Sequence, residues 1–440
     1  MFPEFFIKAV QLLLSLSILI VLHELGHFIP AKLFGTRVEK FYLFFDVKYS
    51  LFKKKIGETV YGIGWLPLGG YVKISGMIDE SFDKEQMQKP PQPWEFRSKP
   101  AWQRLIIMLG GVTVNLLLGF FIYMMVLFVW GKETLPQENI PLGLEPSALI
   151  QEIGFEKGDK IVNVDGKVLD NVMQINRMLL LRPVEKIKVE KLNGSTEDII
   201  VPENIGNDIF QSGQINSFLP LFSATLDSVL NDSPALYAGI QSGDRILSIN
   251  NESIYDYGSF INWLDNNADD VIDVVVERGA SNYTLSIDRN DDGTIGVLKK
   301  DSRIKTINKK VGLVDSVKQG FDYGYWQLYD YISGFSFVFT KKGAQQLGGF
   351  GTIGNLFPAK WDWKGFWGST ALLSIILAFM NVLPIPALDG GHVMFLIYEI
   401  VTGKRPSDKF MEVSTMIGFF LLIAVVLYAN GNDLFRAFSW

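Results

Sequence analysis

The most constraining feature of the chain is the run between Lys8 and Lys32, in which Glu24 is the one ordinarily charged side chain. The rest of the run is mostly Leu, Ile, Val, Ala and Ser, a composition typical of a helix that crosses a membrane. An ionisable group inside such a helix is costly and usually marks a functional site. The segment 1–31 is therefore predicted to be a membrane span that carries such a site.

Glu24 belongs to the sequence His23-Glu24-Leu25-Gly26-His27. On a helix, side chains four residues apart share a face, so His23 and His27 can bind one metal ion. Glu24 points to a neighbouring face, where it can take a proton from a metal-bound water. The alternative is a chance match on an ordinary helix, and the position inside an apolar span favours the metal site.

Three further segments are long and apolar enough to cross a bilayer, which takes about 20 residues. They cover 105–131, 365–400 and 412–440. Hydrophobic residues make up 48% of the 440-residue chain, which favours a hybrid of membrane and soluble parts. The net charge of −6 gives no basis for nucleic-acid binding, and the absence of cysteine excludes thiolate metal ligands.

Basic residues predict the orientation of the spans. The segment 32–104 holds 13 Lys and Arg, and the loop 401–411 holds three more. The positive-inside rule assigns both segments to the cytoplasm, which leaves both termini and 132–364 on the outer side. The first and third spans then run in the same direction. His23, His27 and Asp389 are therefore expected at similar depth, near the cytoplasmic face.

Asp389 is the expected third metal ligand, because a catalytic zinc ion usually has three protein ligands and one water. It follows Pro384 and Pro386, which interrupt regular helix, and precedes two glycines that permit close backbone approach. A helix cap or an ion pair is the alternative role for this carboxylate. Three other polar residues each have two possible roles. Asn381 either contacts substrate or forms a hydrogen bond between helices. Asn115 either forms a helix–helix contact or supports a metal ligand, and His392 is either a ligand or a support for one.

The segment 32–79 reads as strands and turns, rich in glycine, aromatic and β-branched residues. It is apolar for a cytoplasmic loop, which favours a hairpin that re-enters the membrane. Its edge is expected to pair with an extended substrate, the alternative being a purely structural hairpin. The residues assigned to substrate are Gly62, Ile63, Gly64, Trp65, Gly69, Gly70 and Tyr71. The Pro-rich segment 80–104 is predicted to be a loose linker.

The outer region contains an internal repeat. Gly154–Ile161 is matched further along the chain by Gly239–Ile246, which predicts two copies of one domain at 132–218 and 219–302. The connecting segment 303–364 is amphipathic and aromatic, and its helix is expected to lie at the membrane interface.

His-Glu-Leu-Gly-His in a first span, Asn-x-x-Pro-x-Pro-x-Leu-Asp-Gly-Gly-His in a later one and paired outer domains resemble the site-2 protease family of intramembrane zinc metalloproteases. The resemblance implies a protein of four transmembrane helices with a re-entrant β-loop and two tandem PDZ-like α/β domains. It implies one Zn²⁺ on His23, His27 and Asp389, with Glu24 as general base and Asn381 on the substrate. Two departures are Gly110-Gly111-Val112, where relatives often have Gly-Pro, and the lack in the first repeat of the Ser-Pro-Ala turn at Ser233-Pro234-Ala235.

The resemblance also implies a setting. The enzyme would lie in the inner membrane of a bacterium, with its termini and PDZ-like domains in the periplasm and its active site near the cytoplasmic face. Its substrates would be single-span membrane proteins such as anti-sigma factors, trimmed first by a periplasmic site-1 protease in an envelope stress response, and remnant signal peptides. The competing classes are a non-catalytic membrane scaffold and a metal-ion transporter. The complete set of catalytic groups counts against the first, and their clustering at one depth counts against the second.

Overall fold

The computed structural model describes residues 2–67, 69–77, 90–299 and 306–438. Parts of several predicted segments therefore lie outside the described residues: Leu68 and 78–79 of the β region, 80–89 of the linker, and the junction between 219–302 and 303–364. The chain divides into two compact units. One comprises Met1–Gly131 with Lys310–Trp440, and the other comprises Lys132–Lys309.

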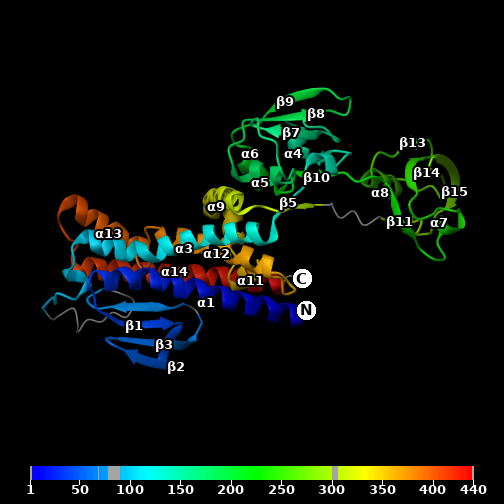
Figure 1. Ribbon diagram of the computed structural model, residues 1–440. Helices are drawn as coiled ribbons and strands as arrows, with labels where there is room; N and C mark the ends of the chain where they lie inside the picture. Colours follow the sequence, from blue (N-terminus) through cyan, green and yellow to red (C-terminus); the bar gives the residue numbers. More distant parts are fainter. Residues whose placement is uncertain (1, 68, 78–89, 300–305, 439–440) are drawn as a thin grey trace. The chain divides into compact units, whose positions relative to one another are not determined.

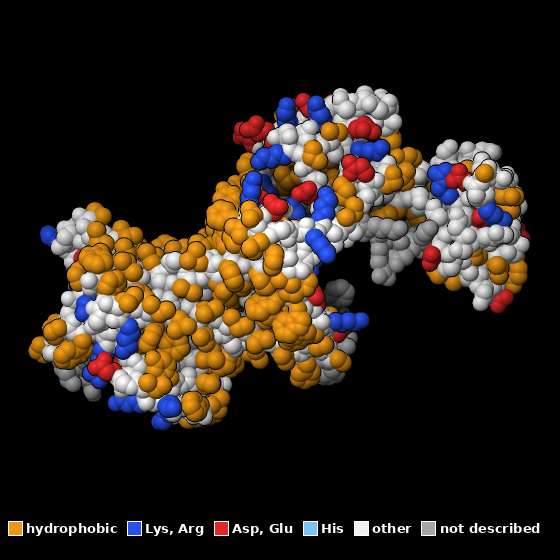
Figure 2. Space-filling model, viewed as in Figure 1, with side chains coloured by type: hydrophobic (Ala, Val, Ile, Leu, Met, Phe, Trp, Pro, Cys, Tyr) orange, Lys and Arg blue, Asp and Glu red, His pale blue; other side chains and the backbone are white. Residues whose placement is uncertain are grey.

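Within the described part of the chain, four helices are long and apolar enough to cross a membrane (Figure 1). They are α1 (Phe2–Leu33), α3 (Ala101–Trp130), α12 (Trp363–Val382) and α14 (Asp408–Phe438). The helices α3 and α14 each begin one turn before the predicted span. Figure 2 shows apolar side chains over most of the visible surface of these helices, whereas acidic and basic side chains gather on the other unit.

The third predicted span, 365–400, is two helices rather than one. The helix α12 ends at Val382, and a second helix, α13 (Asp389–Thr402), begins after a non-helical break. Pro384 and Pro386 lie in this break, as expected for residues that cannot donate a helical hydrogen bond. Asp389 is consequently the first residue of a helix and not part of a continuous span.

The helix α3 lies at the centre of its unit, where it packs against α1, α12, α13 and the amphipathic α9 (Leu313–Phe335). Its closest contact is with α1, because a Cβ on Gly110 would collide with the carbonyl oxygen of Gly26. Two helices can approach this closely only where both carry small residues. This contact holds the helical turn of His23 and His27 directly against α3.

The segment after α1 forms a four-stranded sheet in the order β2-β3-β1-β4. Strand β1 pairs in parallel with β3, and the other two pairs are antiparallel. The strands are β1 (Val38–Leu43), β2 (Phe45–Ile56), β3 (Thr59–Leu66) and β4 (Tyr71–Ile74). Strand β3 is therefore interior, and the free edges belong to β2 and β4.

The later part of the predicted linker 80–104 is ordered structure rather than a loose connection. Phe96, in the short helix η1 (Phe96–Ser98), is buried among residues of α1, α3 and α13. The backbone N–H of Arg37 donates to Trp94 at 2.9 Å, and the N–H of Phe96 donates to Ser75 at 2.8 Å. The prolines of this segment predict a loose connection, but Phe96 packs on the helices, and the two hydrogen bonds hold the segment to residues that flank β1 and β4.

The predicted aromatic connection 303–364 contains α9, η3 (Ser336–Phe339), α10 (Lys341–Gln346) and α11 (Phe350–Gly354). The buried face of α9 is small and polar, and it includes Gly320, Gly324 and Asp330. A Cβ on Gly320 would lie 2.7 Å from Met124 of α3. Aromatic residues beside this face also pack on the neighbouring helices, Phe321 on Phe120 of α3 and Tyr331 on Phe379 of α12.

The unit Lys132–Lys309 contains two hydrophobic cores, one built from residues between Leu135 and Phe218 and the other from residues between Ala224 and Ile295. Its two ends pair as β5 (Lys132–Thr134) with β17 (Ile307–Lys309). The first core belongs to η2 (Gln137–Asn139), β6 (Leu144–Pro146), α4 (Ala148–Gln151), β7 (Lys160–Val164), α5 (Gln174–Leu181), β8 (Lys186–Glu190), β9 (Thr196–Ile200), α6 (Ile205–Ser212) and β10 (Phe218–Pro220). The second belongs to β11 (Leu226–Val229), α7 (Pro234–Tyr237), β12 (Arg245–Ile249), β13 (Glu252–Ser253), α8 (Tyr257–Asn266), β14 (Val271–Arg278), β15 (Ser281–Asp288) and β16 (Val297–Lys299).

The two halves repeat in backbone detail. Asp159 and Asp244 are both buried, and each accepts a backbone hydrogen bond of 2.9 Å from the residue three positions earlier. Each also forms an ion pair with a basic residue later in the chain: Asp159 with Lys191 at 3.1 Å, and Asp244 with Arg278 at 2.7 Å. The halves differ in α6, which packs on α5 in the first half. Their identity as PDZ domains stays a prediction.

Gly110→Leu is predicted to disrupt the contact between α1 and α3. A leucine side chain cannot fit against the Gly26 carbonyl, and because the obstacle is backbone the helices must separate, at a cost of about 3 kcal/mol. Thermal unfolding of the purified protein in detergent measures the loss. Gly368→Leu is the matched control, because nothing lies within 4 Å of a Cβ at Gly368 in α12. Equal unfolding temperatures for the two variants would contradict the close packing.

Candidate metal centre

His23, His27 and Asp389 meet at one point, although α1 supplies the two histidines and α13 supplies the aspartate. The Nε2 atoms of His23 and His27 lie 3.2 Å apart. Oδ2 of Asp389 lies 3.2 Å from Nε2 of His23 and 3.3 Å from Nε2 of His27. The three predicted ligand atoms thus form a nearly equilateral triangle.

The triangle has the dimensions of one face of a zinc tetrahedron. Ligands at about 2.0–2.1 Å from zinc in tetrahedral directions lie about 3.3 Å from one another. Oδ2 of Asp389 is buried and has no hydrogen-bond partner. A Cβ on Gly111 would collide with Nε2 of His27 and lie 2.7 Å from Nε2 of His23, so this glycine keeps the space beside the triangle open. The donor set and its geometry therefore fit zinc.

Hydrogen bonds from α3 orient both histidines. Nδ1 of His27 lies 2.8 Å from the carbonyl oxygen of Ile107, to which its N–H donates. A proton on Nδ1 leaves the lone pair of Nε2 free for a metal ion. Nδ1 of His23 lies 3.2 Å from the side-chain amide of Asn115, a fully buried residue. Both imidazoles are thus held with Nε2 towards the centre of the triangle.

The Asn115 amide supports His23 best when its oxygen faces the ring. Oδ1 of Asn115 is buried without a partner, and its nitrogen lies beside His23. Exchanging the two amide atoms, which are hard to distinguish by shape, lets Oδ1 accept the proton of His23 Nδ1. The backbone of Asn115 is itself fixed, because Ser374 Oγ of α12 donates to its carbonyl at 2.6 Å.

The break between α12 and α13 places Asp389. Ala387 has φ 92°, a left-handed conformation that is strained for a residue with a side chain. A Cβ on Gly390 would collide with the carbonyl oxygen of Leu383, so the chain can fold back here only with glycine. Gly418 of α14 approaches the Pro386 backbone with similar closeness. The loop is thus held from both sides.

Glu24 lies beside the triangle rather than in it. It is half-buried, and its carboxylate lies close to the backbone amide of Val72 in β4. Val72 pairs with Phe41 of β1, and β4 is an edge strand of this sheet. The edge strand β4 and Glu24 of α1 are therefore neighbours.

Gly62, Ile63, Gly64 and Trp65, which the sequence assigns to substrate, do not lie at a sheet edge, and their contact with substrate stays a prediction. All four lie in β3, an interior strand between β1 and β2. A Cβ on Gly62 would collide with the Tyr42 ring, and one on Gly64 would collide with the Phe45 backbone. The two glycines of β3 thus permit close packing inside the sheet.

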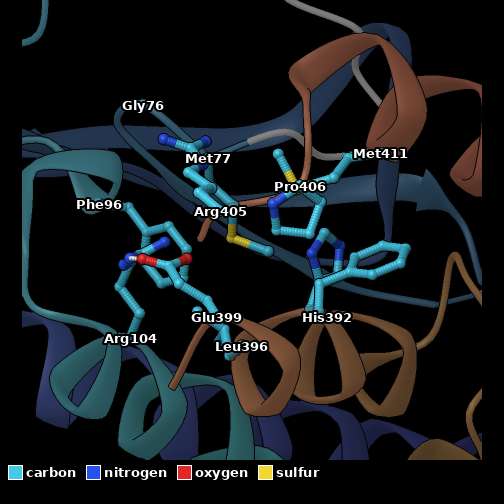
Figure 3. A pocket seen from close by; sticks show the side chains of 11 residues that line it. Gly76, Met77, Phe96, Arg104, His392, Leu396, Glu399, Arg405, Pro406 and Met411 are labelled. Atoms are coloured by element: carbon cyan, nitrogen blue, oxygen red, sulfur yellow. Dashed lines mark hydrogen bonds and ion pairs between the residues drawn. The ribbon is translucent and has the colours of Figure 1, made fainter. Parts of the chain in front are cut away.

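The remaining predicted residues are spread around the centre. Gly69 and Gly70 precede β4, and Tyr71 begins it, with its hydroxyl donating to Asp46 at 2.8 Å. Asn381, near the end of α12, is half-buried and has no hydrogen bond from its side chain to any described residue. His392 is not part of the triangle and lines a separate pocket (Figure 3). That pocket also contains Arg104 of α3, paired with Glu399 of α13 at 2.5 Å.

Comparison with known proteins shows similarity along nearly the entire chain. The sequence profile described as Peptidase family M50 matches residues 11–425. The Regulator of sigma E protease of Haemophilus influenzae is 26% identical over 456 residues, which cover 96% of this chain and 98% of that protein. The Regulator of sigma-E protease RseP of Salmonella typhimurium is 27% identical over 463 residues, which cover 96% of this chain and 97% of that protein. A protein of Neisseria meningitidis named as a candidate zinc metalloprotease is 25% identical over 446 residues, or 96% and 97%.

Asn115→Leu is predicted to weaken zinc binding roughly 10- to 100-fold, because His23 loses the group that fixes its orientation. Asn115→Asp is the matched variant: its carboxylate accepts from Nδ1 of His23, so zinc affinity should stay near that of the unaltered protein. Competition with a chromophoric chelator measures both affinities. An Asn115→Leu protein that binds zinc as tightly as Asn115→Asp would contradict this role.

Proposed function

The chain belongs to peptidase family M50, the site-2 zinc metalloproteases, and we propose that it is an intramembrane endopeptidase that cuts the membrane-spanning segments of single-span proteins. The observation that supports this most is the nearness of three groups. The zinc-sized triangle, the carboxylate of Glu24 and the edge strand β4 lie together beside the apolar helix α1.

His23, His27 and Asp389 would hold one zinc ion, with no thiolate available in a chain that lacks cysteine. The ion would polarise the peptide carbonyl and lower the pKa of its bound water. Glu24 would take the proton from that water as it attacks and would pass it to the leaving amine. Asn381, whose side chain has no hydrogen bond to the described residues, would hold the substrate backbone or the developing oxyanion.

A transmembrane substrate must be unwound before it is cut, because its peptide groups are bonded within the helix. The edge of β4 offers unpaired backbone groups to an extended segment, as in β-strand addition. Tyr71 to Ile74 would take this role, which the sequence had assigned more broadly to Gly62–Ile74. A strand added there would lie next to Glu24, since Val72 already contacts that carboxylate.

The setting follows from the relatives and from charge. Two relatives are named for the regulation of sigma E, which supports anti-sigma factors as substrates. The two halves of Lys132–Lys309 would act as tandem PDZ-like domains that exclude bulky substrates until a site-1 protease has trimmed them. The basic residues of 32–104 and 401–411 support an orientation in which the metal centre lies near the cytoplasmic face of an inner membrane and both termini are periplasmic. Remnant signal peptides are a second substrate class.

Glu24→Gln is predicted to keep zinc and the fold but to lose at least about a thousandfold in the cleavage rate, because the amide cannot accept the proton of the water. The purified variant is mixed with a single-span substrate, and the cut fraction is followed on gels alongside zinc content. His23→Ala, which removes a ligand, should lose both zinc and activity. An active Glu24→Gln protein would refute the proposed chemistry.

Val72→Pro is predicted to slow cleavage at least about tenfold while zinc content is unchanged. In the proposed pairing the Val72 N–H binds the substrate and so points away from β1, and proline would remove it without breaking a hydrogen bond to β1. Val72→Ala keeps the N–H and should retain most of the activity. Equal rates for the two variants would mean that the substrate does not pair with this edge.

A further inference from the structure

The strand β2 forms an exposed apolar edge that substrate binding at β4 does not use. It lies at the opposite side of the sheet from β4 and is 12 residues long. Tyr49, Leu51 and Phe52 are 59%, 65% and 57% exposed. Trp65 of β3 extends this surface and stacks on Tyr49, with the two ring centroids 5.8 Å apart. An apolar, exposed edge strand in water would be an aggregation site.

A basic run follows this apolar stretch on the same strand. Lys53, Lys54 and Lys55 are all exposed and lie opposite Gly62, Tyr61 and Val60 of β3. None of the three side chains has a hydrogen bond or an ion pair with another residue that the structure describes. Three adjacent positive charges are therefore left without an acidic partner from the described part of the chain.

Lysines on an edge strand often serve only to prevent pairing with another chain. That role does not explain why Tyr49, Leu51 and Phe52 stand exposed beside them, since these residues would promote the association that lysines oppose. Apolar and aromatic side chains next to a basic cluster are instead suited to a membrane interface, where the apolar part enters the lipid and the charges meet the headgroups.

The position of the sheet agrees with contact to lipid. A Cβ on Gly70 would lie 2.5 Å from Ile20 of α1, a helix that continues for several turns beyond this point to Leu33. At about 1.5 Å per residue, the sheet reaches about 20 Å back along a membrane-spanning helix. Figure 2 shows basic side chains adjoining apolar ones on the part of the surface where Figure 1 draws β2.

We propose that Lys53, Lys54 and Lys55 bind the phosphate groups of anionic phospholipids in the leaflet that the apolar part of β2 enters. On the proposed orientation this is the cytoplasmic leaflet, where anionic lipids attract basic segments next to membrane spans. Lipid held at β2 fixes one edge of the sheet and leaves the opposite edge, β4, facing Glu24. The proposed lipid site and the proposed substrate-binding strand are thus at the two opposite edges of one sheet.

The test uses the full-length, zinc-loaded protein in a neutral detergent, without substrate. Native mass spectrometry measures the binding of dioctanoyl phosphatidylglycerol, of dioctanoyl phosphatidylcholine and of inorganic phosphate. We expect K53Q/K54Q/K55Q to bind phosphatidylglycerol about a hundredfold more weakly, because each lysine beside an anionic lipid surface contributes a factor of about five. The unaltered protein should prefer phosphatidylglycerol to phosphatidylcholine, and millimolar phosphate should not displace the lipid.

Two variants separate lipid binding from loss of fold or of charge in general. K53R/K54R/K55R keeps the charges and should bind as the unaltered protein does. K160Q/K186Q/K188Q removes three charges from the other unit and should also leave binding unchanged. Equal binding by K53Q/K54Q/K55Q, or displacement of the lipid by phosphate, overturns the proposal.

A protein partner is tested in nanodiscs of pure phosphatidylcholine. Slower substrate cleavage by K53Q/K54Q/K55Q in these discs would show that the lysines meet the substrate, which also overturns the lipid site. The inference rests on the proposed topology only for the choice of leaflet, because the detergent measurement needs neither a leaflet nor a cleavage reaction. Glu24→Gln should bind phosphatidylglycerol normally, so failure of the proposed chemistry and failure of the lipid site give different results.

Discussion

The backbone contact between Gly26 and Gly110 is the constraint on which the metal centre depends. It brings α1 against α3 with no side chain between them, so His23 and His27 come within hydrogen-bonding distance of Asn115 and Ile107. The same helix α3 packs on α12 and α13, the two helices that flank the loop before Asp389. One central helix thus sets the positions of all three ligands.

The meeting of His23, His27 and Asp389 was predictable from sequence, because these residue types have few other roles inside an apolar span. Two histidines and an acid within an apolar span cannot serve as solvated surface, and the prolines before Asp389 marked an irregular loop inside the membrane. Four membrane helices were likewise predictable from length and charge alone. The sequence predicted an irregular loop at these prolines but one span over 365–400, whereas the chain forms two helices, α12 ending at Val382 and α13 beginning at Asp389.

The strand order of the four-stranded sheet could not be predicted from the sequence. Glycines and aromatic residues after α1 indicated strands, but strand order is a property of tertiary pairing and cannot be read from a single strand. The parallel pairing of β1 with β3 put Gly62 and Gly64 inside the sheet and made β4 the edge beside Glu24. The ordered segment around Phe96 was not predicted for a related reason. Its prolines indicate a loose connection, whereas the helices that bury Phe96 are distant in sequence.

The ligands of the metal centre come from opposite ends of the chain, since His23 and His27 lie near its start and Asp389 near its end. Neither histidine can meet the carboxylate until the last helices have entered the membrane and packed on α3. A growing chain of this protein therefore has no complete metal centre while it is being synthesised beside other membrane proteins that are also emerging. The order of assembly would thus delay proteolytic activity until the helices that carry all three side chains have packed together.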